Sequence, residues 1–195
     1  MKLKDPVIKD IEKIKSCKTC NLYNNQKPLL DNIKYDRVDV MWIGLSAKLV
    51  KDLVLDIPLS VDTNSGNLIN EIENENLLIK FYKTNLVKCL PLDNNDKLRY
   101  PKQIEIDSCV KHIKSEIDFL KPKIIFLLGN KVSGAIEKHF KIKFNKTFDG
   151  YIYKSYFNEG ILFIPIHHPS YISVYKRKDK QLYIESIQSI IDKEF

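Results

Sequence analysis

Four cysteines are the side chains of this chain best suited to hold a metal. Cys17 and Cys20 form a C-x-x-C pair, whereas Cys89 and Cys109 stand alone in separate segments. Zinc ribbons and fingers normally bring their ligands as two short pairs, while a [4Fe–4S] cluster takes four cysteines at varied spacing. The spacing therefore favours a [4Fe–4S] cluster. Zinc is the less favoured alternative, because ligand type alone does not exclude it.

Two disulfides are the other use that four cysteines can have, and disulfides need an oxidising compartment. The first residues, MKLKDPVIKDIEKIK, contain no apolar stretch of the kind found in a secretory signal peptide. No apolar run of the chain is long enough to span a bilayer. We therefore expect a cytoplasmic protein with reduced cysteines and no membrane contact. Its net charge of +7 attracts polyanions such as DNA, although charge alone is a weak indication.

Apolar runs alternate with helical patterns, which is typical of a layered α/β domain. Short apolar runs predict buried strands at 38–44, 84–89, 123–129 and 161–167. Helical patterns occur at 5–16, at 67–82 with a break near 74–76, and at 101–120, 130–140 and 179–193. We expect a single domain over 1–195, with 1–36 as its N-terminal helix and cluster-binding segment. Its predicted fold is an α/β three-layer sandwich, in which helices flank a central, mainly parallel, four-stranded sheet.

Three of the predicted strands end in residues that can contact a ligand. The first is followed by Gly44-Leu45-Ser46-Ala47-Lys48, the second contains Asn85, and the last leads into His167-His168-Pro169-Ser170. Open α/β sheets bind ligands beyond the carboxyl ends of their strands. We therefore expect these three segments to converge on one site.

These motifs, in this order, resemble the uracil-DNA glycosylase superfamily and, within it, the iron–sulfur type called family 4. The resemblance runs from about Cys17 to the C-terminal helix. It rests on the four cysteines, on TNLVKCLP (84–91), on PKIIFLLG (122–129) and on HPSY (168–171). It implies a [4Fe–4S] cluster with Cys17, Cys20, Cys89 and Cys109 as its ligands.

Two positions depart from the family pattern. Where the family has G-E-x-P-G, this chain has Leu45 in place of the carboxylate that orients the attacking water. Where the family has a phenylalanine that stacks on the flipped uracil, this chain has Leu59. Because of the first departure, no residue is clearly assigned to activate the attacking water. Ser46, Asp52 and Asp56 are close in the sequence and are the candidates. The second opens one wall of the pocket and removes an aromatic face.

The resemblance also implies roles for single residues. His168 is expected to donate a hydrogen bond to the base oxygen on which charge grows as the glycosidic bond breaks. Asn85 is expected to read the base, because one amide supplies a donor and an acceptor. Further substrate contacts are expected from Gly44, Leu45, Ser46, Ala47 and Leu59. DNA contacts are expected from Ser170, Tyr171, Lys176, Arg177 and Lys178.

Together these expectations describe a monomeric DNA glycosylase that flips a deaminated or modified base out of DNA and hydrolyses its N-glycosidic bond. Uracil is the default substrate, and DNA repair is the role that follows from it. One alternative is a glycosylase for a bulkier modified pyrimidine of phage DNA, which would serve antiviral defence. The other is a non-catalytic DNA-binding relative, which the two departures favour and which the retained Asn85 and His168 oppose.

Overall fold

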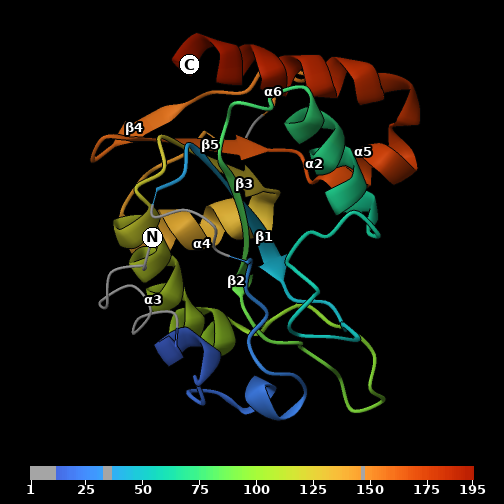
Figure 1. Cartoon of the computed structure of the whole chain (residues 1–195), viewed down its shortest axis with the longest axis vertical. Coiled ribbons are helices and arrows are strands. Elements are labelled where there is room, and N and C mark those ends of the chain that lie inside the picture. The colour runs from blue at the N-terminus through green and yellow to red at the C-terminus, as the bar shows by residue number, and fades with distance from the viewer. Residues whose placement is uncertain (1–11, 33–36, 146–147) are drawn as a thin grey trace.

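The structure, a computed structural model, describes residues 12–32, 37–145 and 148–195. One five-stranded sheet with the strand order β2-β1-β3-β5-β4 forms its centre (Figure 1). The strands are β1 (Val40–Ser46), β2 (Phe81–Val87), β3 (Ile124–Leu128), β4 (Tyr156–Asn158) and β5 (Ile161–Ile166). β1, β2, β3 and β5 run parallel, while β4 pairs antiparallel with β5. The α/β class and the mainly parallel sheet are therefore confirmed, and the four predicted strands are its parallel part.

Helices cover both faces of this sheet. On one side lie α2 (Asn64–Asn74), α5 (Pro169–Tyr175) and α6 (Lys180–Glu194), and on the other lie α3 (Gln103–Leu120) and α4 (Asn130–Phe140) (Figure 1). Two short 3-10 helices are η1 (Asn21–Asn24) and η2 (Arg177–Asp179). None of the helices in the described part of the chain is long and apolar enough to cross a membrane. The result is the expected three-layer sandwich.

The central strand β1 explains why the sequence shows continuous apolar runs. Val40 and Trp42 pack into the core under α2 and α6, while Met41 and Ile43 pack into the core under α3 and α4. All four side chains are fully buried. A parallel strand covered on both faces needs apolar residues at every position, so it does not alternate.

Two boundaries differ from the sequence prediction. α2 begins at Asn64, earlier than expected, because the Thr63 hydroxyl accepts a hydrogen bond from the Gly66 amide at 2.9 Å and caps the helix. β2 begins at Phe81, inside the range predicted as helical, where Phe81 pairs with Val40 of β1. Residues 12–15 are helical, Ser16 is in a turn, and residues 5–11 of the helix expected at 5–16 lie outside the described residues.

The three-residue strand β4 was not predicted. It is an edge strand whose central residue, Phe157, is 74% exposed. Three residues are too few to show an alternating pattern of apolar and polar side chains. Its pairing with β5 depends on the turn at Glu159 and Gly160, both of which have positive φ angles.

Candidate functional site

A cavity of about 540 Å³ lies at the carboxyl ends of the parallel strands. Its lining includes Gly44, Leu45 and Ser46 of β1, Asn85 of β2, and His168, which follows β5. These residues come from the three segments that the sequence predicted to converge. They meet because parallel strands end at the same edge of the sheet.

The Asn85 side chain lies close against Gly44 of the neighbouring strand. The two residues are register partners, and Asn85 is buried. A Cβ atom at residue 44 would stand 2.4 Å from Asn85 Oδ1 and 3.2 Å from Leu59 Cδ2. Real Cβ atoms do not approach other heavy atoms as closely as 2.4 Å, so glycine at this position is what lets the Asn85 amide lie where it does.

Leu59 lines the same cavity in a strained backbone conformation. Its φ of +53° lies in the left-handed region, which is costly for a residue with a branched side chain. The start of α2 packs directly on this backbone, since a Cβ atom at Gly66 would stand 2.2 Å from the Leu59 carbonyl oxygen. The position of Leu59 as a cavity wall is therefore fixed by helix packing.

His168 is held by the residues that follow it. It is the N-cap of α5, where its Nδ1 accepts a hydrogen bond from the Ser170 amide at 3.3 Å and lies 2.8 Å from the Ser170 hydroxyl. A backbone amide can only donate, so Nδ1 is an acceptor and the ring proton is on Nε2. Burial lowers the pKa of His168 below its ordinary value of 6.5. The ring that lines the cavity is thus neutral at pH 7, and its Nε2–H group has no hydrogen-bond partner among the described residues.

Three residues named for this site from the sequence do not line the cavity. Ala47 is fully buried, and its amide donates to the Val87 carbonyl oxygen at 3.0 Å, so this amide is occupied within the fold. Asp52 and Asp56 accept hydrogen bonds from backbone amides within 51–55 and so stabilise their own loop. Among the described residues that line the cavity there is no Asp or Glu. Among the described residues, no other carboxylate takes the place in the cavity lining of the one that Leu45 replaces.

The polar loop at 91–100 contributes residues that sequence reasoning missed. Leu98, Arg99 and Tyr100 line the cavity. The Arg99 guanidinium binds the Glu105 carboxylate with two nitrogen–oxygen distances of 2.6 and 2.9 Å, and this pair joins the loop to the start of α3. Arg99 and Glu105 are six positions apart around a proline, and nothing in their spacing indicates that this contact brings the loop to the site.

Tyr100 gives the cavity an aromatic side chain. It is 69% exposed, and the Lys131 ammonium lies 4.3 Å from the centre of its ring. A cation at this distance from a tyrosine ring is attracted by the electrons of the ring face. The aromatic face that is missing at Leu59 is thus present elsewhere on the rim.

Two of the residues expected to contact DNA adjoin the histidines. The Ser170 hydroxyl is directed at His168, as described above. Tyr171 is exposed and stacks on His167 with ring centres 6.1 Å apart, while His167 Nδ1 lies 2.9 Å from the Tyr153 hydroxyl. Tyr171 is therefore the exposed member of an aromatic group with His167 and Tyr153 at the start of α5.

The three basic residues expected to contact DNA lie at the end of α5. Lys176, Arg177 and Lys178 are exposed, and Arg177 Nε donates to the Ser173 carbonyl oxygen at 3.0 Å. Cations are favoured at the carboxyl end of a helix, so part of their role is to stabilise α5. Their charged ends also remain accessible to phosphates.

The four cysteines line one small cavity of about 10 Å³. They reach it from the segment before η1, from the chain after β2, and from α3. Two hydrogen bonds hold the chain after η1 against the chain after β2: the Leu29 amide donates to the Lys88 carbonyl oxygen at 2.8 Å, and Asn25 Nδ2 donates to the Leu90 carbonyl oxygen at 2.9 Å. All four cysteines are free thiols.

The cysteine cavity gathers four sulfur donors, the ligand type that zinc and iron–sulfur clusters take. Burial, followed by the neighbouring thiols Cys109, Cys20 and Cys17, raises the pKa of Cys89 to about 12, and burial also raises the pKa of Cys109. A positive metal cluster would offset this cost, because cysteines bind metals as thiolates. The His112 Nε2 atom and the Thr19 Oγ1 atom each lie 3.2 Å from Cys17 Sγ. In the described part of the chain, no group of three His, Cys, Asp or Glu side chains is arranged to hold a metal ion.

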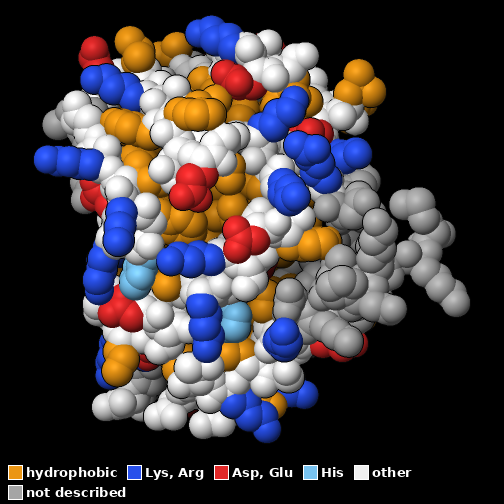
Figure 2. Space-filling model, turned by 90° about the vertical axis from the view of Figure 1, so that its left-hand side faces the viewer, with side chains coloured by type: hydrophobic (Ala, Val, Ile, Leu, Met, Phe, Trp, Pro, Cys, Tyr) orange, Lys and Arg blue, Asp and Glu red, His pale blue; other side chains and the backbone are white. Residues whose placement is uncertain are grey.

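A second large cavity, of about 580 Å³, lies at the amino ends of the strands. Figure 2 looks onto this side of the molecule, where lysine and arginine side chains surround an apolar hollow. Its basic residues are Arg37, Lys114, Lys121, Lys123 and Lys141. None of the strand-end residues named above lines it, so its size does not make it the candidate site.

The structure belongs to the class of α/β enzymes whose ligand site lies at the carboxyl ends of a mainly parallel sheet. A model of the family described as the uracil DNA glycosylase superfamily matches residues 28–190. The chain therefore belongs to this superfamily, and it is an enzyme of the DNA glycosylase type. The resemblance inferred from its motifs is confirmed.

Three curated relatives are named type-4 uracil-DNA glycosylase. The protein of Saccharolobus solfataricus is 24% identical over 94% of this chain and 81% of its own length. The protein of Sulfurisphaera tokodaii is 25% identical over 98% and 82%, and that of Archaeoglobus fulgidus is 21% identical over 92% and 89%. The crystal structure of Pedobacter heparinus SMUG2 superimposes with a TM-score of 0.55 at 16% identity, covering 98% of this chain and 85% of that one. This last likeness supports the fold.

Proposed function

We propose that this protein removes uracil from DNA by hydrolysing its N-glycosidic bond, acting as a monomer. The observation that carries the proposal is the convergence of Asn85 and a neutral His168 with an Nε2 donor in one cavity. Three relatives that share most of the length of this chain are named for the same substrate. Nothing in the comparisons supports antiviral defence or a non-catalytic binder.

The chemistry assigned to the site begins with a base turned out of the stack into the cavity. Uracil presents a carbonyl oxygen beside an N–H, and the Asn85 amide presents a donor and an acceptor that match them. As the glycosidic bond breaks, the electron pair of the bond moves onto the base, and negative charge grows on its oxygens. The His168 Nε2–H group stabilises this charge most at the transition state, because it is already oriented by Ser170.

Water enters after most of the bond breaking has occurred. The sugar is then an oxocarbenium-like cation, which reacts with water that is only weakly activated. As the water oxygen bonds to the sugar carbon, the water loses one proton to solvent, and the departed uracil anion takes up one proton from solvent. With Leu45 in place of a carboxylate, this step relies on polar side chains such as Ser46, which lines the cavity. The expected consequence of this departure is a slower enzyme, since the costly bond breaking depends on other residues.

We also propose that Cys17, Cys20, Cys89 and Cys109 hold a [4Fe–4S] cluster with a structural role. Such a cluster would tie η1, the end of β2 and α3 together. The cysteines lie outside the lining of the base cavity, so no step of base excision is assigned to the cluster.

We expect Cys89→Ser to remove the cluster and to destabilise the fold. Protein purified without oxygen should be brown with bound iron, and the variant should lose both the visible absorbance and the iron. Its thermal unfolding midpoint should fall, because metal binding contributes to folding free energy. Colourless wild-type protein with stoichiometric zinc would replace the cluster by a zinc site.

An excision assay tests the substrate. Wild-type protein should release uracil from DNA that contains a single deoxyuridine, as measured by alkaline cleavage at the resulting abasic site. Matched duplexes with hypoxanthine, hydroxymethylcytosine or glucosylated hydroxymethylcytosine in the same position should react more slowly. Faster release of a modified cytosine would contradict uracil as the substrate, and tight binding without release of any base would contradict catalysis.

A further inference from the structure

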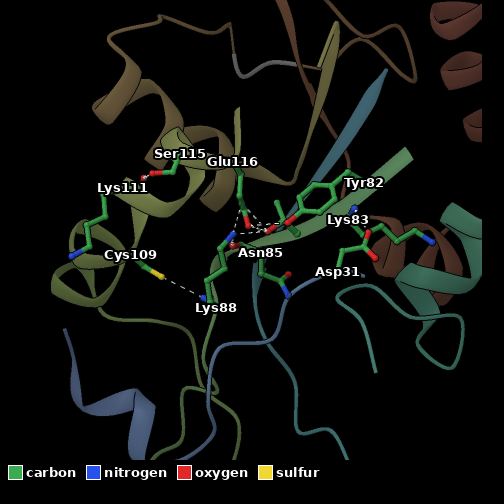
Figure 3. Close-up of polar contacts among 10 residues, drawn as sticks. Asp31, Tyr82, Lys83, Asn85, Lys88, Cys109, Lys111, Ser115 and Glu116 are labelled. Carbon is green, nitrogen blue, oxygen red and sulfur yellow. Dashed lines mark hydrogen bonds and ion pairs between the residues drawn. The ribbon is translucent and has the colours of Figure 1, made fainter. Parts of the chain in front are cut away.

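A buried group of polar side chains lies behind Asn85, on the other face of β2 from the side chain of Asn85 (Figure 3). The Lys88 ammonium is 2.6 Å from Glu116 Oε2 and donates to the Asn85 carbonyl oxygen at 2.9 Å. The hydroxyls of Tyr82 and Thr84 donate to the same Glu116 carboxylate at 3.0 and 3.1 Å. Lys88 is 1% exposed and Glu116 is 3% exposed, so this ion pair is screened from water.

The stability of the fold alone is a weak reason for such a pair. Removing two charges from water costs about as much free energy as their attraction returns. A protein in which well-packed apolar residues replace a buried ion pair is therefore often as stable as the original. What apolar residues cannot do is hold a backbone carbonyl oxygen. The Lys88 ammonium does this at Asn85, the residue whose amide packs against Gly44 and lines the cavity.

We propose that Lys88 and Glu116 are positioning residues for Asn85. Glu116 of α3 orients the Lys88 ammonium, and the ammonium fixes the peptide from which the Asn85 side chain extends into the cavity. This inference rests on the proposed function in one respect, namely that Asn85 reads the base. The placement of Asn85 by Lys88 can be tested without it.

The chain offers a matched control on the same strand. Lys83 also lies in β2 and forms a buried ion pair, with its ammonium 2.7 Å from Glu73 Oε2 of α2. The double variant Lys88→Met/Glu116→Leu removes the proposed positioning pair without leaving a lone buried charge. The double variant Lys83→Met/Glu73→Leu makes the same chemical change at a strand position two residues before Asn85, whereas Lys88 lies three residues after Asn85.

The first measurement is single-turnover excision of uracil. We expect Lys88→Met/Glu116→Leu to lower the rate by about tenfold, the scale for losing one hydrogen bond from a charged group. The control pair should change the rate by less than about twofold, as expected for a site outside the cavity. Equal losses in the two double variants would overturn the proposal.

A double-mutant cycle distinguishes positioning from a general structural role. If Lys88 and Glu116 act through Asn85, removing them in an Asn85→Ala background should cost nothing further, because the side chain they position is already absent. The same fold loss in both backgrounds would overturn the proposal. Each variant is compared at equal iron content, since the Lys88 amide also donates to Cys109 Sγ at 3.4 Å.

The second measurement does not require activity. In protein labelled with ¹⁵N-asparagine, the side-chain amide signal of Asn85 is assigned by its loss in Asn85→Ala. It should shift or broaden in Lys88→Met/Glu116→Leu and stay in place in Lys83→Met/Glu73→Leu. An unchanged signal in the first variant would overturn the proposal. If the wild-type protein excises no base but the Asn85 signal shifts in Lys88→Met/Glu116→Leu, the proposed function is overturned. The placement of Asn85 by Lys88 is then still supported.

Discussion

Replacing His168 by alanine is expected to lower the single-turnover rate of uracil excision by about 10²- to 10³-fold, the usual scale for losing one preorganised donor at a developing negative charge. The His168 ring is half-buried, neutral and oriented through its Nδ1 atom by Ser170, so its Nε2–H group needs no reorganisation as the base departs. Affinity for uracil-containing DNA should change little, because the interaction acts mainly in the transition state.

Two further measurements separate this role from a packing role. Ser170→Ala keeps the ring but removes the hydroxyl at Nδ1, so we expect a loss of excision rate that is smaller than that of His168→Ala. Burial lowers the pKa of His168, so the neutral donor persists as pH falls through the ordinary value of 6.5. The acidic limb of the rate profile should therefore lie below that pH. A rate for His168→Ala within a few-fold of wild type would remove His168 from the mechanism.

The parts of the fold that the sequence predicts best are those in which local pattern and burial agree. β1 is covered on both faces, so its apolar run is visible without any knowledge of its partners. Asn85 and His168 were expected at one site for a geometrical reason, since parallel strands bring their carboxyl ends to a common edge. That rule needs only the order of the elements, and the cavity lined by both residues agrees with it.

Features that depend on contacts between distant segments could not be predicted in the same way. Tyr100 reaches the cavity because Arg99 of its loop binds Glu105, and no periodic pattern records that contact. The amide of Ala47 follows β1 toward the site, but it donates to the Val87 carbonyl oxygen. Asp52 looked close in sequence, but it stabilises its own turn. In Ala47 and Asp52 the chain position is near the site, while the polar group is bound elsewhere in the fold.

The largest change in substrate choice is expected at Asn85. Asn85→Ala should lower uracil excision by about 10²-fold, since it removes two hydrogen bonds to the base of about 1.5 kcal/mol each. Asn85→Asp should lower uracil excision further, because a carboxylate accepts from the base N–H but repels the neighbouring carbonyl oxygen. The same carboxylate can accept from the exocyclic amine of cytosine, so the ratio of cytosine to uracil release should rise.

Gly44 provides an independent way to disturb the Asn85 amide without changing it. In Gly44→Ala the new methyl group would stand 2.4 Å from Asn85 Oδ1, and the side-chain amide must move away. We expect uracil excision to fall toward the level of Asn85→Ala, while the unfolding midpoint falls only slightly, since the atom displaced is the end of a side chain. Combining Gly44→Ala with Asn85→Ala should add little, because both changes remove the same contact with the base. Full excision by Gly44→Ala would contradict this prediction, because it would show that uracil recognition does not need the Asn85 amide in the position that Gly44 allows.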